Sequence, residues 1–243
     1  MRPAQRLILW SLTLMTGCSA PLTQHPGRQV ERTLTAESPL SVSYLLYLPQ
    51  SYGKTRERWP LVIFLHGSGE RGTDLELVKR HGPPRRVEEG ADFPFVLASP
   101  QCPLGRWWSI DQLDALLRHL TATLEVDTDR VYVTGLSMGG FGTWSLALEF
   151  PDRFAAIAPV CGGGIPYRAN LLRDLPVWAF HGRKDPVIPP SYSVEMVEAI
   201  NAAGGNARLT IYPDAGHDSY TETYARADLY EWLLAQRRSA APR

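Results

Sequence analysis

The chain has 243 residues, of which 44% are hydrophobic and 21% are charged. That length and composition suit one soluble globular domain with a full apolar core. The formal net charge is zero and no basic run is interleaved with aromatic residues, so no nucleic-acid partner is expected.

The first residues have the pattern of an export signal. Arg2 and Arg6 give a basic start, and residues 7–15 are apolar apart from two hydroxyl residues. Because that run is too short to span a bilayer as a mature helix, residues 1–17 are expected to be a cleaved signal peptide. Cys18 follows small residues, as in the lipobox of bacterial lipoproteins, and would become the lipidated first residue. An ordinary cleaved signal with an incidental cysteine is the alternative.

Export would place the mature chain in the periplasm or, as a lipoprotein, tethered to the outer membrane, with secretion into the medium as the alternative. The whole chain has 25 basic and 25 acidic residues. Removing residues 1–17 deletes Arg2 and Arg6, so the mature chain would have 23 basic and 25 acidic residues and a net charge of −2. Residues 18–27 are predicted to be a short polar tether, and residues 28–243 a single α/β domain.

Hydrophobic patterning predicts strands and helices that alternate along this domain. Residues 61–65 are continuously apolar, which favours a central strand covered on both faces. The strands are expected at residues 30–34, 41–48, 61–65, 93–98, 131–134, 155–160, 176–181 and 207–212. The helices are expected at residues 74–80, 110–124, 141–150 and 191–203, with a closing helix over 229–234. The run Gly82-Pro83-Pro84 is expected to stop the first helix.

This alternation predicts an α/β fold in which a mostly parallel, doubly wound sheet of about eight strands carries helices on both faces. The loops between the expected strands are brief, so no large lid is expected. In such a sheet, the loops at the carboxyl ends of the strands build the functional site.

One pentapeptide in this pattern carries chemistry, namely Gly135-Leu136-Ser137-Met138-Gly139. It lies between an expected strand and an expected helix, and its G-x-S-x-G spacing is that of a nucleophile elbow. Small residues on either side permit the sharp, strained turn that presents the serine. Ser137 is therefore the candidate nucleophile.

A serine nucleophile needs a base to accept its proton and an acid to orient that base. The loop after the seventh expected strand offers Asp185, and the loop after the eighth offers His217. The resulting order of serine, aspartate and histidine is the one found with this elbow. Asp214 and Asp218 are alternatives for the acid, but as near neighbours of His217 on one loop they are poorly placed to reach its ring.

The remaining site residues are expected in two other loops. The oxyanion hole should use the backbone N–H of Met138 and one from the glycine-rich loop after the third expected strand. In that loop Ser68 is the first choice for the donor and Gly67 the alternative. Trp107 and Trp108 follow the fourth expected strand and are candidates to line an acyl or aryl pocket.

No metal or cofactor is expected. A zinc site made from His66, His181 and His217 would lack the close ligand spacing of such sites. Cys102 and Cys161 would meet an oxidising compartment after export, where they could pair or remain buried free thiols. The sequence leaves both states open.

Taken together, these motifs resemble the α/β-hydrolase superfamily. More narrowly, they are similar to bacterial secreted esterases and "predicted peptidases" related to dienelactone hydrolases and to feruloyl or polyhydroxybutyrate esterases. The stretches that carry the resemblance are 64–72, 100–103, 135–140, 181–189 and 216–220. The resemblance implies the α/β-hydrolase fold and no cofactor, and it agrees with the triad found from the residues. It leaves the substrate open, because members of this group act on different esters.

The sequence thus predicts a serine carboxylesterase that acts on small or protruding acyl esters through an acyl-enzyme. The expected partner is a small-molecule or polysaccharide-linked ester, and the expected membrane contact is a lipid anchor only. The alternatives are a serine peptidase of the same fold, or a feruloyl or acetyl esterase acting on plant polysaccharide. A non-catalytic binding lipoprotein is disfavoured by the complete set of Ser137, Asp185 and His217.

Overall fold

The computed structural model describes residues 25–35 and 40–238, and every structural statement concerns those residues. The expected signal peptide at 1–17, the expected lipidation site Cys18 and most of the expected tether at 18–27 lie outside them. In the described part, no helix combines the length and the apolar character that crossing a membrane requires.

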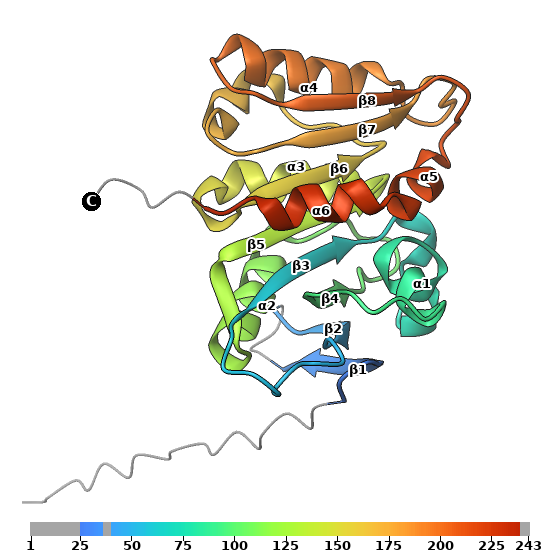
Figure 1. Cartoon of the computed structure of the whole chain (residues 1–243). Helices are drawn as coiled ribbons and strands as arrows, with labels where there is room; N and C mark the ends of the chain where they lie inside the picture. Colours follow the sequence, from blue (N-terminus) through green and yellow to red (C-terminus); the bar gives the residue numbers. More distant parts are fainter. Residues whose placement is uncertain (1–24, 36–39, 239–243) are drawn as a thin grey trace, which may run out of the picture.

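A single sheet of eight strands runs through the described residues, in the order β1-β2-β4-β3-β5-β6-β7-β8 (Figure 1). β1 pairs antiparallel with β2, and β2 antiparallel with β4, whereas all other neighbours run parallel. The strands are β1 (Gln29–Leu34), β2 (Val42–Tyr47), β3 (Trp59–Leu65), β4 (Val96–Pro100), β5 (Val126–Leu136), β6 (Ala156–Val160), β7 (Trp178–Gly182) and β8 (Arg208–Tyr212). The expected mostly parallel, doubly wound sheet is confirmed.

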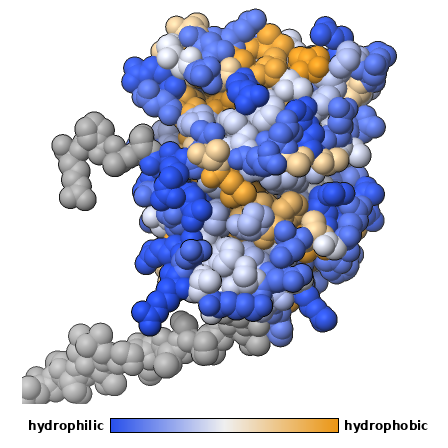
Figure 2. Space-filling model, in the orientation of Figure 1, coloured by the Kyte–Doolittle hydropathy of each residue, from blue (hydrophilic) through white to orange (hydrophobic). Residues whose placement is uncertain are grey.

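Helices cover both faces of this sheet, with α1, α5 and α6 over one face and α2, α3 and α4 over the other (Figure 1). The helices are α1 (Gly82–Glu88), α2 (Ile110–Thr123), α3 (Met138–Glu149), α4 (Ser191–Ala202), α5 (Ser219–Ala225) and α6 (Ala227–Ala235). Short 3₁₀ turns add η1 (Ser68–Glu70), η2 (Leu75–Arg80), η3 (Pro151–Arg153) and η4 (Pro166–Leu172). The face with α6 presents a mostly hydrophilic surface with smaller hydrophobic areas between (Figure 2).

The central strand β3 shows why an unbroken apolar run is needed here. Successive side chains of a strand point to opposite faces. Leu61 and Ile63 accordingly pack in the core beneath α2, α3 and α4, while Val62 and Phe64 pack in the core beneath α1, α5 and α6. Because both faces of β3 are buried, every position of the strand must be apolar.

The first helical segment differs from the sequence expectation. Residues 75–80 form the 3₁₀ turn η2, and Gly82-Pro83-Pro84 begins the helix α1 rather than stopping one. The reason is positional, since the first turn of a helix leaves its N–H groups without intrahelical acceptors and so tolerates proline.

The elements around the elbow are longer than expected. β5 begins at Val126, and the ion pair between Arg130 and Asp127 at 2.8 Å lies inside the strand. α3 begins at Met138 instead of residue 141. Glycines at 139 and 140 lower the helix propensity of this turn, which hides its helical character from the sequence.

Candidate active site

Three connections at the carboxyl edge of the parallel strands supply the candidate catalytic residues. Ser137 directly follows β5, Asp185 follows β7, and His217 follows β8. β6 lies between the first two of these strands. The sheet order therefore brings together side chains that are far apart in the sequence.

Ser137 occupies the strained turn expected of it, with φ of 54° and ψ of −118°. The glycines around it are required by close backbone packing. A Cβ on Gly139 would lie 1.9 Å from the carbonyl oxygen of Leu65, and a Cβ on Gly135 would lie 2.4 Å from the oxygen of Gly139. The turn thus sits directly against the end of β3 and leaves no room for side chains at these two positions.

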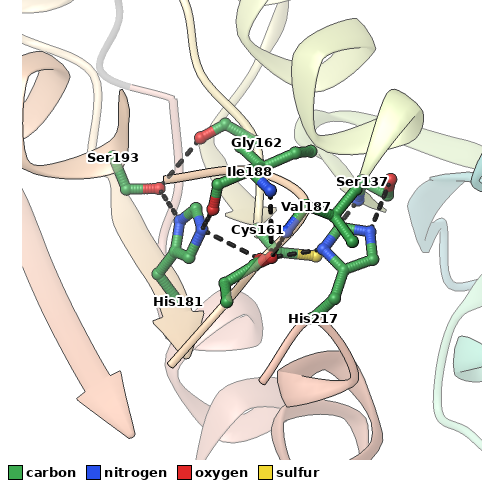
Figure 3. Close-up of polar contacts among 9 residues, drawn as sticks. Ser137, Cys161, Gly162, His181, Val187, Ile188, Ser193 and His217 are labelled. Atoms are coloured by element: carbon green, nitrogen blue, oxygen red, sulfur yellow. Dashed lines mark hydrogen bonds and ion pairs between the residues drawn. The ribbon is translucent and has the colours of Figure 1, made fainter. Parts of the chain in front are cut away.

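The three polar side chains form one continuous hydrogen-bonded line (Figure 3). The hydroxyl of Ser137 lies 2.9 Å from Nε2 of His217, and Nδ1 of the same ring lies 2.8 Å from Oδ2 of Asp185. With Nδ1 protonated, the ring donates to the carboxylate and leaves Nε2 free to accept the proton of Ser137. The geometry is that of a nucleophile, a base and an orienting acid.

Asp185 is held by more than the histidine. Its other oxygen, Oδ1, accepts the backbone N–H groups of Val187 at 2.8 Å and Ile188 at 2.9 Å. Burial acts to raise the pKa of Asp185, but the hydrogen bonds from His217, Ile188 and Val187 outweigh it, so the pKa is lowered. The carboxylate is therefore ionised and fixed in orientation.

The two alternative acids lie elsewhere. Asp214 is exposed and pairs with Lys184 at 2.8 Å. Asp218 is the residue before α5, at its N-cap position. Of the three aspartates weighed, Asp185 is the one whose carboxylate contacts His217.

His181 reinforces the loop that carries the acid. Its Nε2 lies 2.9 Å from the carbonyl oxygen of Ile188 and 3.2 Å from Oδ2 of Asp185, while Nδ1 contacts Ser193 at 2.8 Å. Burial lowers the pKa of His181, and its contacts with Ile188 and Asp185 only partly offset that effect. The ring is thus a neutral support that links β7, the acid loop and α4.

The glycine-rich loop is fixed by His66. Its Nδ1 donates to the carbonyl of Gly67 at 2.6 Å, and its Nε2 accepts the backbone N–H of Cys102 at 3.0 Å. Burial lowers the pKa of His66 to about 4, so the ring is neutral and can make both contacts. It ties the loop after β3 to the loop after β4.

The expected oxyanion donors are Met138, directly after the serine, and Ser68, in the loop after β3. Met138 is the first residue of α3, so its N–H has no acceptor one turn earlier in the helix. Ser68 is the first residue of η1, directly after Gly67. A Cβ on Gly67 would lie 3.6 Å from the Cβ of Ser137, which puts this loop in contact with the nucleophile turn.

Two further contacts were missed by sequence reasoning. The backbone N–H of Ser137 lies 3.3 Å from the sulfur of Cys161. Like Ser137, Cys161 has a positive φ, of 41°. Glu70, at the end of η1, is buried and lies 3.7 Å from His81. Neither contact has a signal in the sequence, because each joins elements that only the tertiary fold brings together.

Cys102 and Cys161 are both unpaired and buried, so of the two states left open the free thiols are found. Burial raises the pKa of Cys161 to about 12 and that of Cys102 to about 11. Both remain protonated at neutral pH and do not compete with Ser137 as nucleophiles. Within the described residues, no group of three or more His, Cys, Asp or Glu side chains could hold a metal ion.

The adjacent tryptophans have different environments. Trp108 is half-buried, donates its indole N–H to the carbonyl of His66 at 3.3 Å and packs against Gly142. Trp107 is 66% exposed and contacts Phe141 edge to face. The structure thus makes Trp108 a packing residue beside the glycine-rich loop and leaves Trp107 open to a ligand.

Known proteins that are similar to this chain are hydrolases and esterases. The family model described as "Dienelactone hydrolase family" matches residues 107–236, more than half of the chain. The "Probable feruloyl esterase C" of Aspergillus terreus is 24% identical over 78% of this chain and 72% of its own length. The "Bifunctional acetylxylan esterase/xylanase XynS20E" of Neocallimastix patriciarum is 26% identical over 53% of this chain and 20% of its own length.

A solved structure described as a thermostable esterase has a TM-score of 0.75 and 32% sequence identity to this chain. The match covers 86% of this chain and 63% of the other, so that protein is longer than the part it shares. The likeness agrees with the sheet order and the helix layers described above.

Proposed function

The chain belongs to the dienelactone hydrolase family, and on that premise we propose that it is a serine carboxylesterase with Ser137, His217 and Asp185 as its triad. The observation that carries the proposal is the unbroken hydrogen-bonded line from the hydroxyl through the imidazole to the carboxylate, at 2.9 and 2.8 Å. The positive φ of Ser137 supports it, because non-glycine residues keep such strain mainly where function requires it.

In the first half of the reaction, the oxygen of Ser137 attacks the ester carbonyl while Nε2 of His217 accepts its proton. The ionised Asp185 then faces an imidazolium and stabilises its charge. Collapse of the tetrahedral intermediate breaks the bond to the alcohol, which leaves with the proton carried by His217. The acyl group remains on Ser137.

In the second half, a water molecule gives its proton to His217 and attacks the acyl-enzyme. The acid is released and Ser137 recovers its hydrogen. In both halves the carbonyl oxygen becomes an anion, for which we propose the backbone N–H groups of Met138 and Ser68 as donors, with Gly67 as the alternative to Ser68. Met138 at the start of α3 also brings the positive end of the helix dipole to that anion.

We propose small or protruding acyl esters as substrates, with feruloyl or acetyl groups on plant polysaccharide as the finer possibility. The relatives named for feruloyl and acetylxylan esterase activity support an ester substrate. A serine peptidase of the same fold is the competing function, and it differs by acting on amides.

A fluorophosphonate label tests the triad. We expect the wild-type chain to be labelled under native conditions and Ser137→Ala to remain unlabelled. Ester turnover in Ser137→Ala should fall by about 10⁵-fold or more. Absence of labelling in the wild type would falsify the proposed chemistry, and labelling that survives in Ser137→Ala would place the nucleophile elsewhere.

A substrate panel tests the reaction class. It should contain nitrophenyl esters from acetate to laurate, methyl ferulate, acetylated xylan and aminopeptidase amides. We expect hydrolysis of the short esters and little turnover of laurate or the amides. Faster cleavage of the amides than of every ester would favour the peptidase.

We also propose that residues 1–17 are removed on export and that Cys18 carries the lipid, with residues 18–27 as tether and 28–243 as the catalytic domain. The basic start, short apolar run and following cysteine support this order. Labelling of bacteria with an alkyne fatty acid should mark the wild-type chain and not Cys18→Ala. Equal labelling of both chains would refute lipidation at this residue.

A further inference from the structure

Three aromatic rings form a row beside the nucleophile turn. The ring of Trp107 contacts that of Phe141 edge to face, with centroids 6.1 Å apart and planes at 87°. Phe141 contacts Tyr192 in the same way, at 5.8 Å and 74°. We call Trp107, Phe141 and Tyr192 the aromatic row.

The aromatic row begins next to the reacting serine. Phe141 lies four residues after Ser137, and its backbone N–H bonds to the carbonyl of that serine at 3.1 Å. Trp107 comes from the connection after β4, and Tyr192 from the start of α4, directly after the loop that holds Asp185. The loop after β4 and the first turns of α3 and α4 are therefore joined by ring contacts.

The rings are held in place by close backbone contacts. A Cβ on Gly163 would lie 2.5 Å from Cδ1 of Tyr192, so that ring rests against the glycine run after β6. Trp108, the neighbour of Trp107, packs against Gly142 and is anchored by its hydrogen bond to His66. A ligand would thus meet a preorganised Tyr192 and a Trp107 whose neighbour in the chain is fixed, which lowers the free-energy cost of ordering these rings.

Exposed hydrophobic side chains gather at the same edge. Trp107 is 66% and Tyr192 46% exposed. In the part of the chain that the structure describes, every exposed large hydrophobic side chain lies in the connections after β4, β6 or β7. Such a concentration in three connections favours a binding surface there, because exposed apolar area scattered at random would not select them.

The chemistry of this edge favours a neutral ligand. Residues 138–148, 161–167 and 186–194 contain no Asp, Glu, Lys or Arg, and the charged neighbour of the row is the exposed Arg106 beside Trp107. Tryptophan and tyrosine also combine a flat apolar face with a polar N–H or O–H at the rim. A pyranose ring matches both features, since it has a face of C–H groups and a rim of hydroxyls. An aliphatic chain would leave the polar tips unused.

We propose that the aromatic row is a subsite for the sugar rings of a neutral glycan that carries the scissile ester. The proposal rests on the esterase function above and names its substrate class. Sugar rings lie along Trp107, Phe141 and Tyr192, and the acyl group projects from the glycan toward Ser137. The open row suits a substituent on a long chain better than an enclosed pocket would.

Binding can be measured without any ester, in the full chain carrying Ser137→Ala. Titration with xylohexaose, cellohexaose and maltohexaose, followed by calorimetry, should show binding of at least one of the three. In the same Ser137→Ala background, a second substitution, Trp107→Ala or Tyr192→Ala, should raise the Kd for the oligosaccharide by at least about tenfold. Trp107→Phe, which keeps a ring, should recover part of the affinity.

Leu104→Ala is the matched control, because Leu104 is 79% exposed and lies in the same connection as Trp107 but has no ring. The chain with Ser137→Ala and Leu104→Ala should bind the oligosaccharide with the same affinity as the chain with Ser137→Ala alone. Trp107→Ala should also be made in the chain that keeps Ser137. Its kinetics with acetylated xylo-oligosaccharide should show a higher KM than wild type.

Three results would overturn the subsite. The first is absence of binding to all three oligosaccharides, and the second is equal affinity in all variants. The third is adsorption to poly(3-hydroxybutyrate) film that Trp107→Ala abolishes, without glycan binding, which would assign the row to a polyester. If the wild type still reacts with a fluorophosphonate, the esterase proposal survives each of these results. Glycan binding without labelling would instead retain the subsite and remove the enzyme.

Discussion

At the scale of single residues, the site depends on how Asp185 is held. One carboxylate oxygen contacts His217, and the other accepts two backbone N–H groups. Rotation of the carboxylate would break all three hydrogen bonds together. The orientation of the histidine ring is therefore set by the backbone of the acid loop as well as by the charge of the acid.

Replacing Asp185 with asparagine should separate these two contributions. Asp185→Asn keeps the shape of the side chain but can donate to Nδ1 of His217, which favours the wrong tautomer. We expect kcat to fall by about 10⁴-fold with little change in thermal stability. Asp214→Asn is the control, since Asp214 pairs with Lys184 on the surface. Comparable loss in both variants would contradict the assignment of the acid.

His66 should make stability depend on pH. Burial lowers its pKa from 6.5 to about 4, so between these values the unfolded chain binds a proton that the folded protein does not. Stability is therefore complete above pH 6.5 and falls as the pH is lowered toward 4. Between pH 7.5 and pH 4.5, the titration of this residue should lower the unfolding free energy by about 2.5 kcal/mol.

Urea unfolding of wild type and His66→Asn at both pH values measures this contribution. Asparagine can still donate to the carbonyl of Gly67 but does not titrate. We expect the variant to be less stable at pH 7.5 and to lose less stability on acidification. Burial also lowers the pKa of His181, so that residue adds an acid dependence of its own to both proteins. The contribution of His66 is therefore the difference between wild type and variant in the stability lost from pH 7.5 to 4.5. Parallel acid dependence in both would show that His66 is not the titrating group.

At the scale of elements, α3 shows where sequence patterns succeed and fail. The strand and the serine before it follow from apolar patterning and motif spacing. The first turn of the helix does not, because its glycines are selected by contacts with β3 and β6 rather than by helix propensity. α1 is a similar case, in which the prolines that signal a helix stop instead occupy a helix start.

Two glycine substitutions test that explanation. In Gly139→Ala the new Cβ would lie 1.9 Å from the carbonyl oxygen of Leu65, and backbone must move to relieve the overlap. We expect a loss of at least about 3 kcal/mol in unfolding free energy, or failure to fold. Gly69→Ala meets nothing within 4 Å and should change stability by less than about 1 kcal/mol. Similar melting temperatures for both variants would refute the packing argument.

At the scale of the whole molecule, one sheet is covered on both faces and each face has its own core. The fold class follows from the sequence because a doubly covered sheet leaves continuous apolar runs such as β3. The proposed triad also follows from the sequence, since its residues lie where strands end. The contacts of Ser137 with Cys161 and of Phe141 with Tyr192 do not, because they depend on the sideways packing of strands and helices.

The molecule should need no disulfide for stability. Cys102 and Cys161 are buried free thiols, and the two cores are built from apolar side chains. We expect the same melting temperature with and without dithiothreitol. Peptide mapping should find both residues alkylated by iodoacetamide only after denaturation. The structure would be contradicted by a peptide pair linked through these two cysteines that disappears on reduction, together with a lower melting temperature of the reduced protein.

The order of the strands along the chain has an evolutionary consequence. The residues of the proposed triad follow β5, β7 and β8, whereas Trp107 follows β4, in the first half of the chain. Phe141 and Tyr192 share the second half with the triad, so Trp107 is the member of the aromatic row that stands apart in the sequence. Mutation or recombination in the first half can therefore change the proposed sugar contact at Trp107 while Ser137, Asp185 and His217 are passed on unchanged.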